Sequence, residues 1–550
     1  MSPRTMAGLL RQYAQTRGEQ PALRFATETG WTEYGYSRLW EAACRVAAGL
    51  HAAGVRPGDA VLMLVPEVEP SVVSLFGVWA LGAVPVQVGV PFRLTDVGAF
   101  LDSLRVTAAR LEARTLVVSE ALAAFAPEAE ALKVLSAEAL MACAPGTPDP
   151  EAAPGPALMQ LTSGSTGHPR AVVLTHERLM LHMACMSEAL PSHGKSVAVS
   201  WLPLNHDMGL IGGLLFPFYN GFVGHLLSPA DFRARPLRWL EVMSETKATL
   251  CAAPPSAYAL MLRLSQRAQE AGLDLSRWEC AMVGAEPISA ALLRRFSDAF
   301  AKVGFRAEAF FPVYGLAEAT VAVTFPKLLS PTRCDVVDRA ALERDGVAVP
   351  REAGPGALEL VGTGAPIPQT ELRIAGPEGE LLPERRVGEI LVRAPTLMQG
   401  YFRDPAATEE VLRGGWLRMG DLGYRADGAL FVTGRQKELI IKGGYNLIPS
   451  VLEEIAGAVE GVRSGCVVAV GVRSEEDETE RVFLVAETKL EAPEWPALIE
   501  RVQAALKAQG VAVDRILPVE PGALPKTTSG KLRRRAVAEA LAANRPLQSL

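Results

Sequence analysis

A run of small polar residues is the part of this sequence best suited to hold phosphate, and it consists of Thr162, Ser163, Gly164, Ser165, Thr166 and Gly167. Glycines allow backbone N–H groups to turn towards one centre, and Ser and Thr hydroxyls add further donors. Apolar residues at 157–159 and 172–174 flank the run and predict a turn between two strands, although a lone run of this kind is more often a flexible linker. A Walker loop would have a lysine after the last glycine, where His168 and Pro169 stand instead. The run is therefore predicted to be a phosphate loop of another kind.

Two groups of side chains further along the chain are suited to a nucleotide and its metal. Tyr314, beside Gly315, can lie flat against a planar base, and Glu318 offers a hard carboxylate for Mg²⁺ next to phosphates. His206 and Asp207 follow a predicted strand, which is where enzymes with parallel sheets place ligand contacts. Taken singly, Tyr314 is as easily a core aromatic, and His206 is as easily a helix cap.

Three turns add further polar groups. One follows a predicted strand at 279–283 and comprises Gly284, Ala285, Glu286 and Pro287. Asp421 and Arg435 each follow a glycine; the first can accept both hydroxyls of a ribose, and the second can assist it with positive charge. Lys531 ends a polar loop near the C-terminus. Each signal is weak alone, because such pairs are usually turns and Lys531 is followed by three arginines, as in a solvated basic tail.

The elements that would carry these groups alternate between helix and strand. Helices are predicted at 40–51 and 71–81, and near-continuous apolar strands at 60–65 and 83–88. The same alternation continues in strands at 196–201, 248–252 and 279–283. Apolar strands separated by helices predict parallel sheets that are covered on both faces.

The pattern changes after about residue 355. Short strands joined by Gly/Pro turns predict a β-rich subdomain, with strands at 358–361, 371–374, 388–393 and 429–432. A last unit follows, with strands at 465–470 and 482–488 and helices at 450–459, 497–509 and 533–542. The predicted fold class is α/β. A large N-terminal domain, 1–435, contains two parallel-type α/β subdomains and the β-rich subdomain, and a small mobile α+β domain, 436–550, follows it.

Composition narrows the class of protein. A length of 550 residues requires several domain-sized units, and 49% hydrophobic with 21% charged residues is an ordinary globular balance. The net charge of −6, without a long basic tract, argues against nucleic-acid binding. Seven scattered cysteines without a C-x-x-C pair predict neither a disulfide framework nor a zinc site. The N-terminus lacks a signal-peptide core, and Pro217 and several glycines interrupt the apolar stretch 209–227. We therefore expect a soluble cytoplasmic enzyme without a membrane span, either a monomer or a dimer.

Seven motifs together resemble the adenylate-forming superfamily, which comprises acyl-CoA synthetases, peptide-synthetase adenylation domains and luciferases. They lie, in order, at 162–167, 284–287, 314–318, 420–421, 434–437, 442–444 and 525–531. The resemblance extends from about Tyr13 to Arg535. It implies an enzyme that uses ATP and Mg²⁺ to convert a carboxylic acid into an acyl-adenylate, with release of pyrophosphate.

The resemblance also implies a role for each motif. Residues 162–167 would hold the triphosphate, and Thr166 and Glu318 would be the protein groups at Mg²⁺. Tyr314 would stack on adenine beside the backbone of 284–287.

The remaining roles concern the ribose and the reacting groups. Asp421 would hold the ribose diol, assisted by Arg435. Lys531 would neutralise charge shared by the carboxylate and phosphate oxygens, with His206 as a further catalytic candidate. Lys437 stands where the family has the hinge of its small domain.

Within the superfamily, two segments look like the corresponding segments of the fatty acyl-AMP ligases: residues 201–212 and residues 314–320. An extra segment at about 328–358 falls where those enzymes carry an insertion. In that branch the insertion packs against the small domain, limits its rotation and directs the acyl group to the phosphopantetheine of a holo-acyl carrier protein in polyketide or lipopeptide pathways. Three features depart from the expected pattern: 442–446 is closer to the CoA ligases, Arg170 replaces the usual lysine, and Ala171 replaces the usual glycine.

The leading hypothesis is a stand-alone fatty acyl-AMP ligase, and three alternatives remain. These are an acyl-CoA synthetase, a β-lactone-forming synthetase and a non-catalytic acyl- or nucleotide-binding relative. The acyl pocket is expected near 206–216, 251–258 and 283–284. Residues 533–535, all arginine, are either a docking site for an acidic carrier protein or a solvated helix end.

Overall fold

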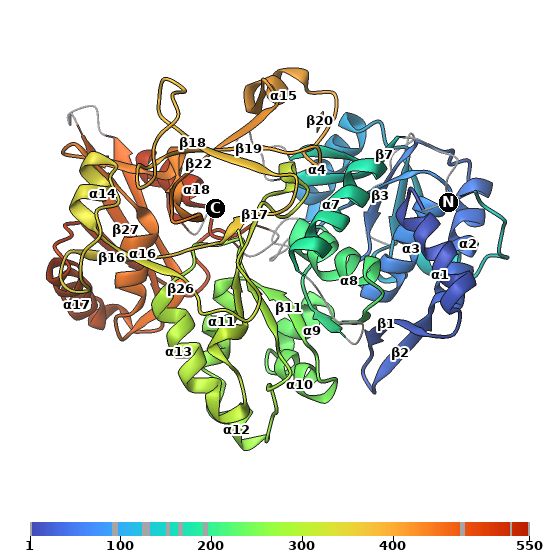
Figure 1. Cartoon of the computed structure of the whole chain (residues 1–550), viewed down its shortest axis with the longest axis horizontal. Helices are drawn as coiled ribbons and strands as arrows, with labels where there is room; N and C mark the ends of the chain where they lie inside the picture. Colours follow the sequence, from blue (N-terminus) through green and yellow to red (C-terminus); the bar gives the residue numbers. More distant parts are fainter. Residues whose placement is uncertain are drawn as a thin grey trace.

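The structure is a computed structural model, and it describes residues 3–90, 97–123, 132–149, 155–162, 169–190, 196–473, 479–527 and 531–547. Figure 1 shows the blue to cyan N-terminal elements on the right, the green elements below the centre and the red C-terminal elements on the left. Two largely parallel sheets, a β-rich part and a small C-terminal α/β part make up the molecule. The predicted fold class is confirmed.

A seven-stranded sheet forms the centre of the large domain, in the order β13-β12-β11-β9-β10-β1-β2. Its strands are β1 (Pro21–Ala26), β2 (Trp31–Gly35), β9 (Val197–Ser200), β10 (Val223–Leu226), β11 (Leu250–Ala253), β12 (Cys280–Val283) and β13 (Phe310–Pro312). Neighbours pair in parallel except β1 and β2. Because parallel strands end at the same edge, residues after β9, β12 and β13 are brought close together.

A second, wholly parallel sheet has the order β4-β3-β5-β6. It contains β3 (Ala60–Leu64), β4 (Val84–Gln87), β5 (Thr115–Val118) and β6 (Lys133–Ser136). All residues of β3 are buried, as expected for a strand covered on both faces. Helix α3 (Val68–Ala80) is buried from Ser71 to Ala80 and packs against α2 (Tyr36–Ala52). The helices and strands predicted over residues 40–88 are therefore confirmed.

Further helices precede, separate or follow the strands of these sheets along the chain. They are α1 (Met6–Arg17), α4 (Val97–Arg110), α5 (Glu120–Ala123), α6 (Ala137–Met141), α7 (His176–Ala189), α8 (Phe216–Tyr219), α9 (Pro229–Ala234), α10 (Arg238–Glu245), α11 (Pro255–Leu262), α12 (Ser265–Glu270), α13 (Ala290–Phe300) and α15 (Pro405–Val411). The apolar stretch at 209–227 contains a buried π-helix, η1 (Met208–Leu215), then α8 and β10. Within the described ranges, no helix combines the length and the apolar character needed to cross a membrane.

The β-rich part is antiparallel. It pairs β18 (Glu371–Ala375), β19 (Gly388–Arg393), β21 (Leu412–Arg413), β22 (Trp416–Ala426) and β23 (Ala429–Arg435). A separate hairpin joins β7 (Pro156–Thr162) to β8 (Arg170–Thr175), and β20 (Gly400–Tyr401) adds to its edge. The predicted strands at 371–374, 388–393 and 429–432 are confirmed, and β22 is a long strand that the sequence pattern does not predict.

The C-terminal part builds its own hydrophobic cores. Its sheet, β26 (Val462–Arg473), β27 (Glu480–Thr488) and β28 (Arg515–Val519), is covered by α16 (Pro449–Gly457), α17 (Trp495–Ala508) and α18 (Arg534–Ala542). A short hairpin, β24 (Ile440–Lys442) and β25 (Tyr445–Leu447), precedes it. The strands and helices predicted in this part are confirmed within a few residues.

The extra segment at 328–358 folds as β15 (Cys334–Asp338) and α14 (Arg339–Asp345), and β15 pairs with β16 (Ala357–Val361). Helix α14 contacts β25 of the C-terminal part. Figure 1 shows the yellow α14 beside the orange elements of that part.

Candidate active site

The hairpin β7–β8 frames the predicted phosphate loop. Thr162 ends β7 and pairs with Arg170, the first residue of β8. The predicted turn between two strands is thus confirmed at both of its ends. The rest of the loop, Ser163, Gly164, Ser165, Thr166 and Gly167, lies outside the described residues, and its phosphate-binding role stays a prediction.

Asp421 is buried and lies at the centre of a hydrogen-bonded triad with the half-buried Tyr314 and the more exposed Arg435. Tyr314 Oη donates to its Oδ2 at 2.7 Å, and Arg435 Nε donates to its Oδ1 at 2.8 Å. Asp421 on β22 and Arg435 on β23 are directly paired residues of one ladder, so the sheet fixes their ion pair. Burial, and then the neighbouring carboxylate, raise the pKa of Tyr314, whereas Asp421 raises the pKa of Arg435. Tyr314 therefore stays a neutral donor, and Asp421 keeps lone pairs for a further donor such as a ribose hydroxyl.

The turn after β12 requires its small residues. A Cβ on Gly284 would lie 2.8 Å from Val313 Cγ2, and Ala285 has φ +67°. The Glu286 carboxylate accepts from Ser256 N and Ser256 Oγ, each at 3.0 Å, at the start of α11. The side chain of Glu286 thus caps a helix, while Gly284, Ala285 and Pro287 bring backbone to the same sheet edge as Tyr314.

Gly315 is required by a close backbone approach. A Cβ at this position would lie 1.7 Å from Val321 O, inside any allowed contact. The tight return of the chain places Tyr314 opposite Thr324 and leaves Glu318 in the turn between them.

Glu318 is a buried carboxylate, only 5% exposed, and Tyr401 Oη donates to its Oε1 at 2.9 Å. Burial raises the pKa of Glu318, against the opposing effect of hydrogen bonds that include the one from Tyr401. The Arg170 guanidinium lies 5.3 Å from the centre of the Tyr401 ring. Tyr401 therefore connects the end of the phosphate hairpin to Glu318.

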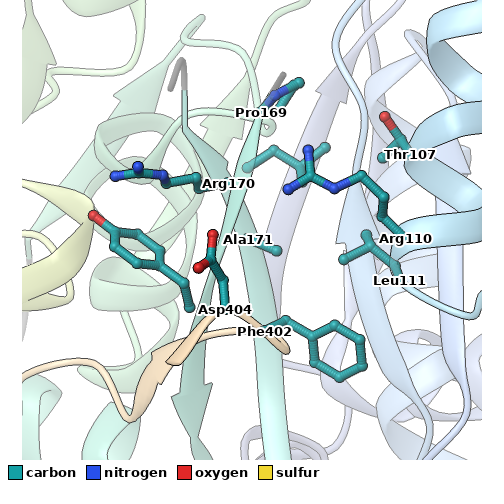
Figure 2. Close-up of a pocket in the computed structure, with 10 residues that line it drawn as sticks. Thr107, Arg110, Leu111, Pro169, Arg170, Ala171, Phe402 and Asp404 are labelled. Carbon is teal, nitrogen blue, oxygen red and sulfur yellow. The ribbon is translucent and has the colours of Figure 1, made fainter. Parts of the chain in front are cut away.

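A small pocket opens where this hairpin faces α4. Its lining includes Arg110, Leu161, Arg170 and Tyr401. Figure 2 shows Arg110 reaching from α4 towards the strand that carries Pro169, Arg170 and Ala171.

Glu318 fits a Mg²⁺ ion that is shared with a substrate. The described part of the chain contains no cluster of three or more His, Cys, Asp or Glu side chains arranged for a metal. Mg²⁺ commonly binds through one or two carboxylates and completes its shell with substrate phosphates and water. A single buried carboxylate beside the phosphate hairpin is such a donor.

His206 and Asp207 form a pair after β9, with Nδ1 and Oδ1 2.7 Å apart, and Asp207 also accepts from Met208 N at the start of η1. Burial tends to raise the pKa of Asp207. The positive charge and hydrogen bond of His206, and then the charge of Lys531, have the opposite effect and are stronger, so the pKa is lowered overall. Burial is the main cause that lowers the pKa of Lys531, with Asp207 the strongest opposing charge. Lys531 is therefore close enough to Asp207 for each charge to shift the pKa of the other.

Asp421, Arg435 and Glu286 also act on the pKa of Lys531. The charges of these large-domain residues thus reach the C-terminal lysine, and its catalytic role stays a prediction. Residues 528–530, which precede it, lie outside the described ranges.

Two other predicted residues stand elsewhere. Lys437 is exposed, in the short helix η5 (Gln436–Glu438) that follows β23. Arg534 is bound by Glu438 at 2.9 Å and Glu453 at 2.7 Å and is only 19% exposed. For Arg534, these ion pairs and its low exposure argue against both alternatives given for residues 533–535, a docking site and a solvated helix end.

Tyr401 is a site residue that the sequence motifs do not reveal. It belongs to a two-residue strand, and its partner Glu318 is 83 positions away. The only local sign is Gly400 before it, since this glycine has φ +152° and lies against Thr408.

The large α/β domain, the small C-terminal domain and the site between them define an adenylate-forming enzyme fold. The chain belongs to the AMP-binding enzyme family, which matches residues 10–402, and it is a ligase. It is 34% identical over 507 residues to a putative acyl-CoA synthetase of Caulobacter vibrioides, covering 91% of this chain and 88% of that protein. It is 35% identical over 399 residues to a medium-chain-fatty-acid–[acyl-carrier-protein] ligase of Moorena producens, covering 69% of this chain and 67% of that protein.

Among solved structures, one from a study of fatty acyl-adenylate ligases of E. coli and L. pneumophila superposes with a TM-score of 0.91. The two chains are 31% identical, and the match covers 99% of each.

Proposed function

We propose that this ligase activates a fatty acid, or a related carboxylic acid, with ATP to give acyl-AMP and pyrophosphate. The phosphopantetheine thiol of a holo-acyl carrier protein then attacks the acyl carbon, which forms a thioester and releases AMP and the thiol proton. The observation that supports the first half of this proposal is that the charges of Asp207, Asp421 and Glu286 all act on the pKa of Lys531. A cation near the groups expected to hold a nucleotide is what adenylation requires.

The nucleoside is held by the triad around Asp421. Its carboxylate already accepts from Tyr314 and Arg435, so its orientation is set before a ribose hydroxyl approaches. Tyr314 lies at the end of β13, and its ring and the backbone of 284–287 form the surfaces for adenine.

The carboxylate oxygen of the acid attacks the α-phosphorus, and the bond to the departing pyrophosphate breaks. Negative charge then develops on oxygens that Lys531 contacts, with His206 and Asp207 beside it. Mg²⁺, held by Glu318 and Thr166 together with the triphosphate, would supply charge neutralisation for the leaving pyrophosphate.

The proposal that a carrier protein is the acceptor is supported by contacts between the insertion, residues 328–358, and the C-terminal part. Arg339 Nη2 donates to Gln509 O, 2.5 Å away in the C-terminal part. Val337 and Leu342 of the insertion share a hydrophobic cluster with Ile448. Burial raises the pKa of Glu343, beside Arg339, to about 7. These contacts oppose rotation of residues 436–550 about Lys437, the movement that would admit CoA.

The second candidate function is acyl-CoA synthesis. The run Lys442 to Asn446, which resembles the CoA ligases, and the acyl-CoA synthetase name of the Caulobacter relative both favour it.

One experiment separates these functions. The purified enzyme is given ATP, Mg²⁺ and a series of fatty, hydroxy and aromatic acids, and acid-dependent exchange of pyrophosphate into ATP is measured; we expect exchange with fatty acids. CoA or a holo-carrier protein is then added, and transfer to the carrier protein should be the faster reaction. Fast CoA thioester formation would favour the second function, and no exchange with any acid would contradict adenylation itself.

A further inference from the structure

His182 on α7 is a fully buried imidazole that contacts none of the groups assigned above to substrates. Ala322 N–H donates to its Nε2 at 3.2 Å. Since Nε2 accepts, Nδ1 carries the hydrogen and donates to Thr396 Oγ1, also at 3.2 Å. Burial lowers the pKa of His182 to about 3, in agreement with a neutral ring that uses both nitrogens. The ring therefore joins two chain segments that are far apart in sequence.

The first of these segments is the turn that carries Glu318. Two residues after it, Thr320 is fully buried with φ +70° and ψ −63°, a conformation that costs a β-branched residue free energy. Thr320 Oγ1 donates to Thr396 O at 2.6 Å, and Ala322 donates to His182. The strained turn is thus held on both sides by contacts that pass through Thr396 and His182.

The second segment, residues 396–401, holds Glu318 directly. Met398 N donates to Glu318 O at 2.8 Å, and Tyr401 Oη donates to Glu318 Oε1 at 2.9 Å. Both the backbone and the carboxylate of Glu318 are therefore positioned by the strand that His182 anchors through Thr396.

Helix α7 adds a second contact one turn earlier. Arg178 Nη1 donates to Leu397 O and Met398 O, each at 2.5 Å. Residues 178 and 182 lie on the same face of the helix, four positions apart. The helix begins at His176, directly after β8 of the phosphate hairpin. It therefore links the hairpin rigidly to the segment that holds Glu318.

We propose that His182 is a positioning residue, which sets the place of the Glu318 carboxylate relative to the phosphate hairpin and so the affinity of the site for the metal–nucleotide complex. This inference rests on the proposed adenylation function. We expect His182 to affect binding of the metal and not binding of the acid. Its hydrogen bonds connect it with the residues around Glu318 and not with Asp207 or Lys531.

The test uses the full-length protein and His182→Phe, which keeps a ring but removes both hydrogen bonds. Mn²⁺ binding is measured by electron paramagnetic resonance in the presence of an ATP analogue with a methylene group between the α and β phosphorus atoms. Pyrophosphate exchange is measured as a function of Mg²⁺ and of the acid. We expect Mn²⁺ affinity to fall about tenfold and kcat by about ten- to a hundredfold, as for small displacements of catalytic groups, with KM for the acid unchanged.

His176→Phe is the matched control. His176 is the first residue of the same helix, is 9% exposed, and burial lowers its pKa to about 4. Its Nδ1 has no hydrogen-bond partner among the described residues. The control removes a buried imidazole whose Nδ1 makes no hydrogen bond to the described residues of the Glu318 turn, so it should leave Mn²⁺ affinity unchanged.

Two further variants keep the test valid where His182→Phe does not fold. His182→Asn retains a donor at the Nδ1 position, and Thr320→Val removes the bond to Thr396 O while keeping the branched shape; both should weaken Mn²⁺ binding less than His182→Phe. A variant with a lower melting temperature but wild-type Mn²⁺ affinity and kcat would overturn the inference. Absence of acid-dependent exchange in the wild-type protein would instead overturn the proposed function, and a Mn²⁺ measurement on that protein still decides the role of His182.

Discussion

Two buried carboxylates of the site, Asp421 and Glu318, are each held by a tyrosine hydroxyl. Asp421 also has Arg435 as an ion-pair partner, so its charge is neutralised within the protein. Glu318 has no ion-pair partner among the described residues, and burial raises its pKa. A tyrosine hydroxyl orients both carboxylates. Asp421 is thereby fixed as a hydrogen-bond acceptor, whereas the charged form of Glu318 would be stabilised by a nearby metal ion.

Lys531→Ala should lower acid-dependent pyrophosphate exchange by about a thousandfold, because its interaction with the reacting oxygens is strongest in the transition state. ATP binding, measured by calorimetry, should change little. The wild-type rate should also fall at alkaline pH, with a midpoint below the ordinary lysine pKa of 10.5, since burial lowers the pKa of Lys531 and only the ammonium form neutralises charge.

Lys489→Ala is the control for this substitution, because Lys489 is an exposed lysine of the same domain. Wild-type exchange in Lys531→Ala would contradict the role assigned to the residue.

At the scale of elements, continuous apolar strands were the predictable part of the fold. β3, β9, β11 and β12 are short, apolar and bounded by turns, and each lies within two residues of its predicted limits. β22 could not be predicted in this way, because it contains glycines and charged residues that are unusual in strands. It is held instead by pairing on both sides, with irregular register against β19 and β23.

Site residues likewise fall into those that the sequence pattern could place and those that depend on tertiary contacts. Groups that follow predicted strands, such as His206 and Gly284, could be placed near one another from sequence because parallel strand ends share one sheet edge. Tyr401 and His182 could not, since their contacts depend on three-dimensional packing between segments with no shared periodicity.

The π-helix η1 suggests where the acyl chain lies. Gly212 is buried, yet no described atom beyond its chain neighbours and its own helix backbone lies within 4 Å of a Cβ built on it. Interiors are close-packed, so unfilled space beside a buried glycine is a place for a ligand. π-Helices are frequent at functional sites.

Gly212→Leu should therefore shorten the preferred substrate. We expect kcat/KM for tetradecanoic acid to fall about tenfold or more relative to hexanoic acid, as for methylene-scale discrimination by an apolar pocket. Gly212→Ala adds one methyl group and should keep the wild-type preference. An equal loss for both acids with Gly212→Leu would argue that the space does not receive the chain.

At the scale of the whole molecule, the insertion contacts the C-terminal part while the charges of Asp207 and Asp421 act on Lys531. Arg534 ties the start of α18 to Glu438, next to the exposed Lys437. The segment that carries Lys531, the proposed hinge and the insertion are thus connected in one arrangement. For residues 436–550 to rotate out of this arrangement, the hydrogen bond of Arg339 and the hydrophobic contacts around Ile448 must break.

The double substitution Arg339→Ala with Glu343→Gln should raise CoA thioester formation about tenfold, because it removes one interdomain hydrogen bond without leaving a buried charge unpaired. Pyrophosphate exchange should be unchanged. Arg351→Ala, which breaks an ion pair inside the insertion with Asp338, is the control. A folded double variant with no gain in CoA transfer would show that these contacts do not select the acceptor.

The bond from Arg339 to Gln509 ends on a main-chain carbonyl. Any residue at position 509 supplies the same acceptor, so substitutions there can accumulate during evolution without weakening the contact. Correlated changes between positions 339 and 509 are therefore not expected in a family of such chains. Selection for this contact would therefore act only on position 339, where arginine would be retained. Methods that infer domain contacts from co-variation would not detect it.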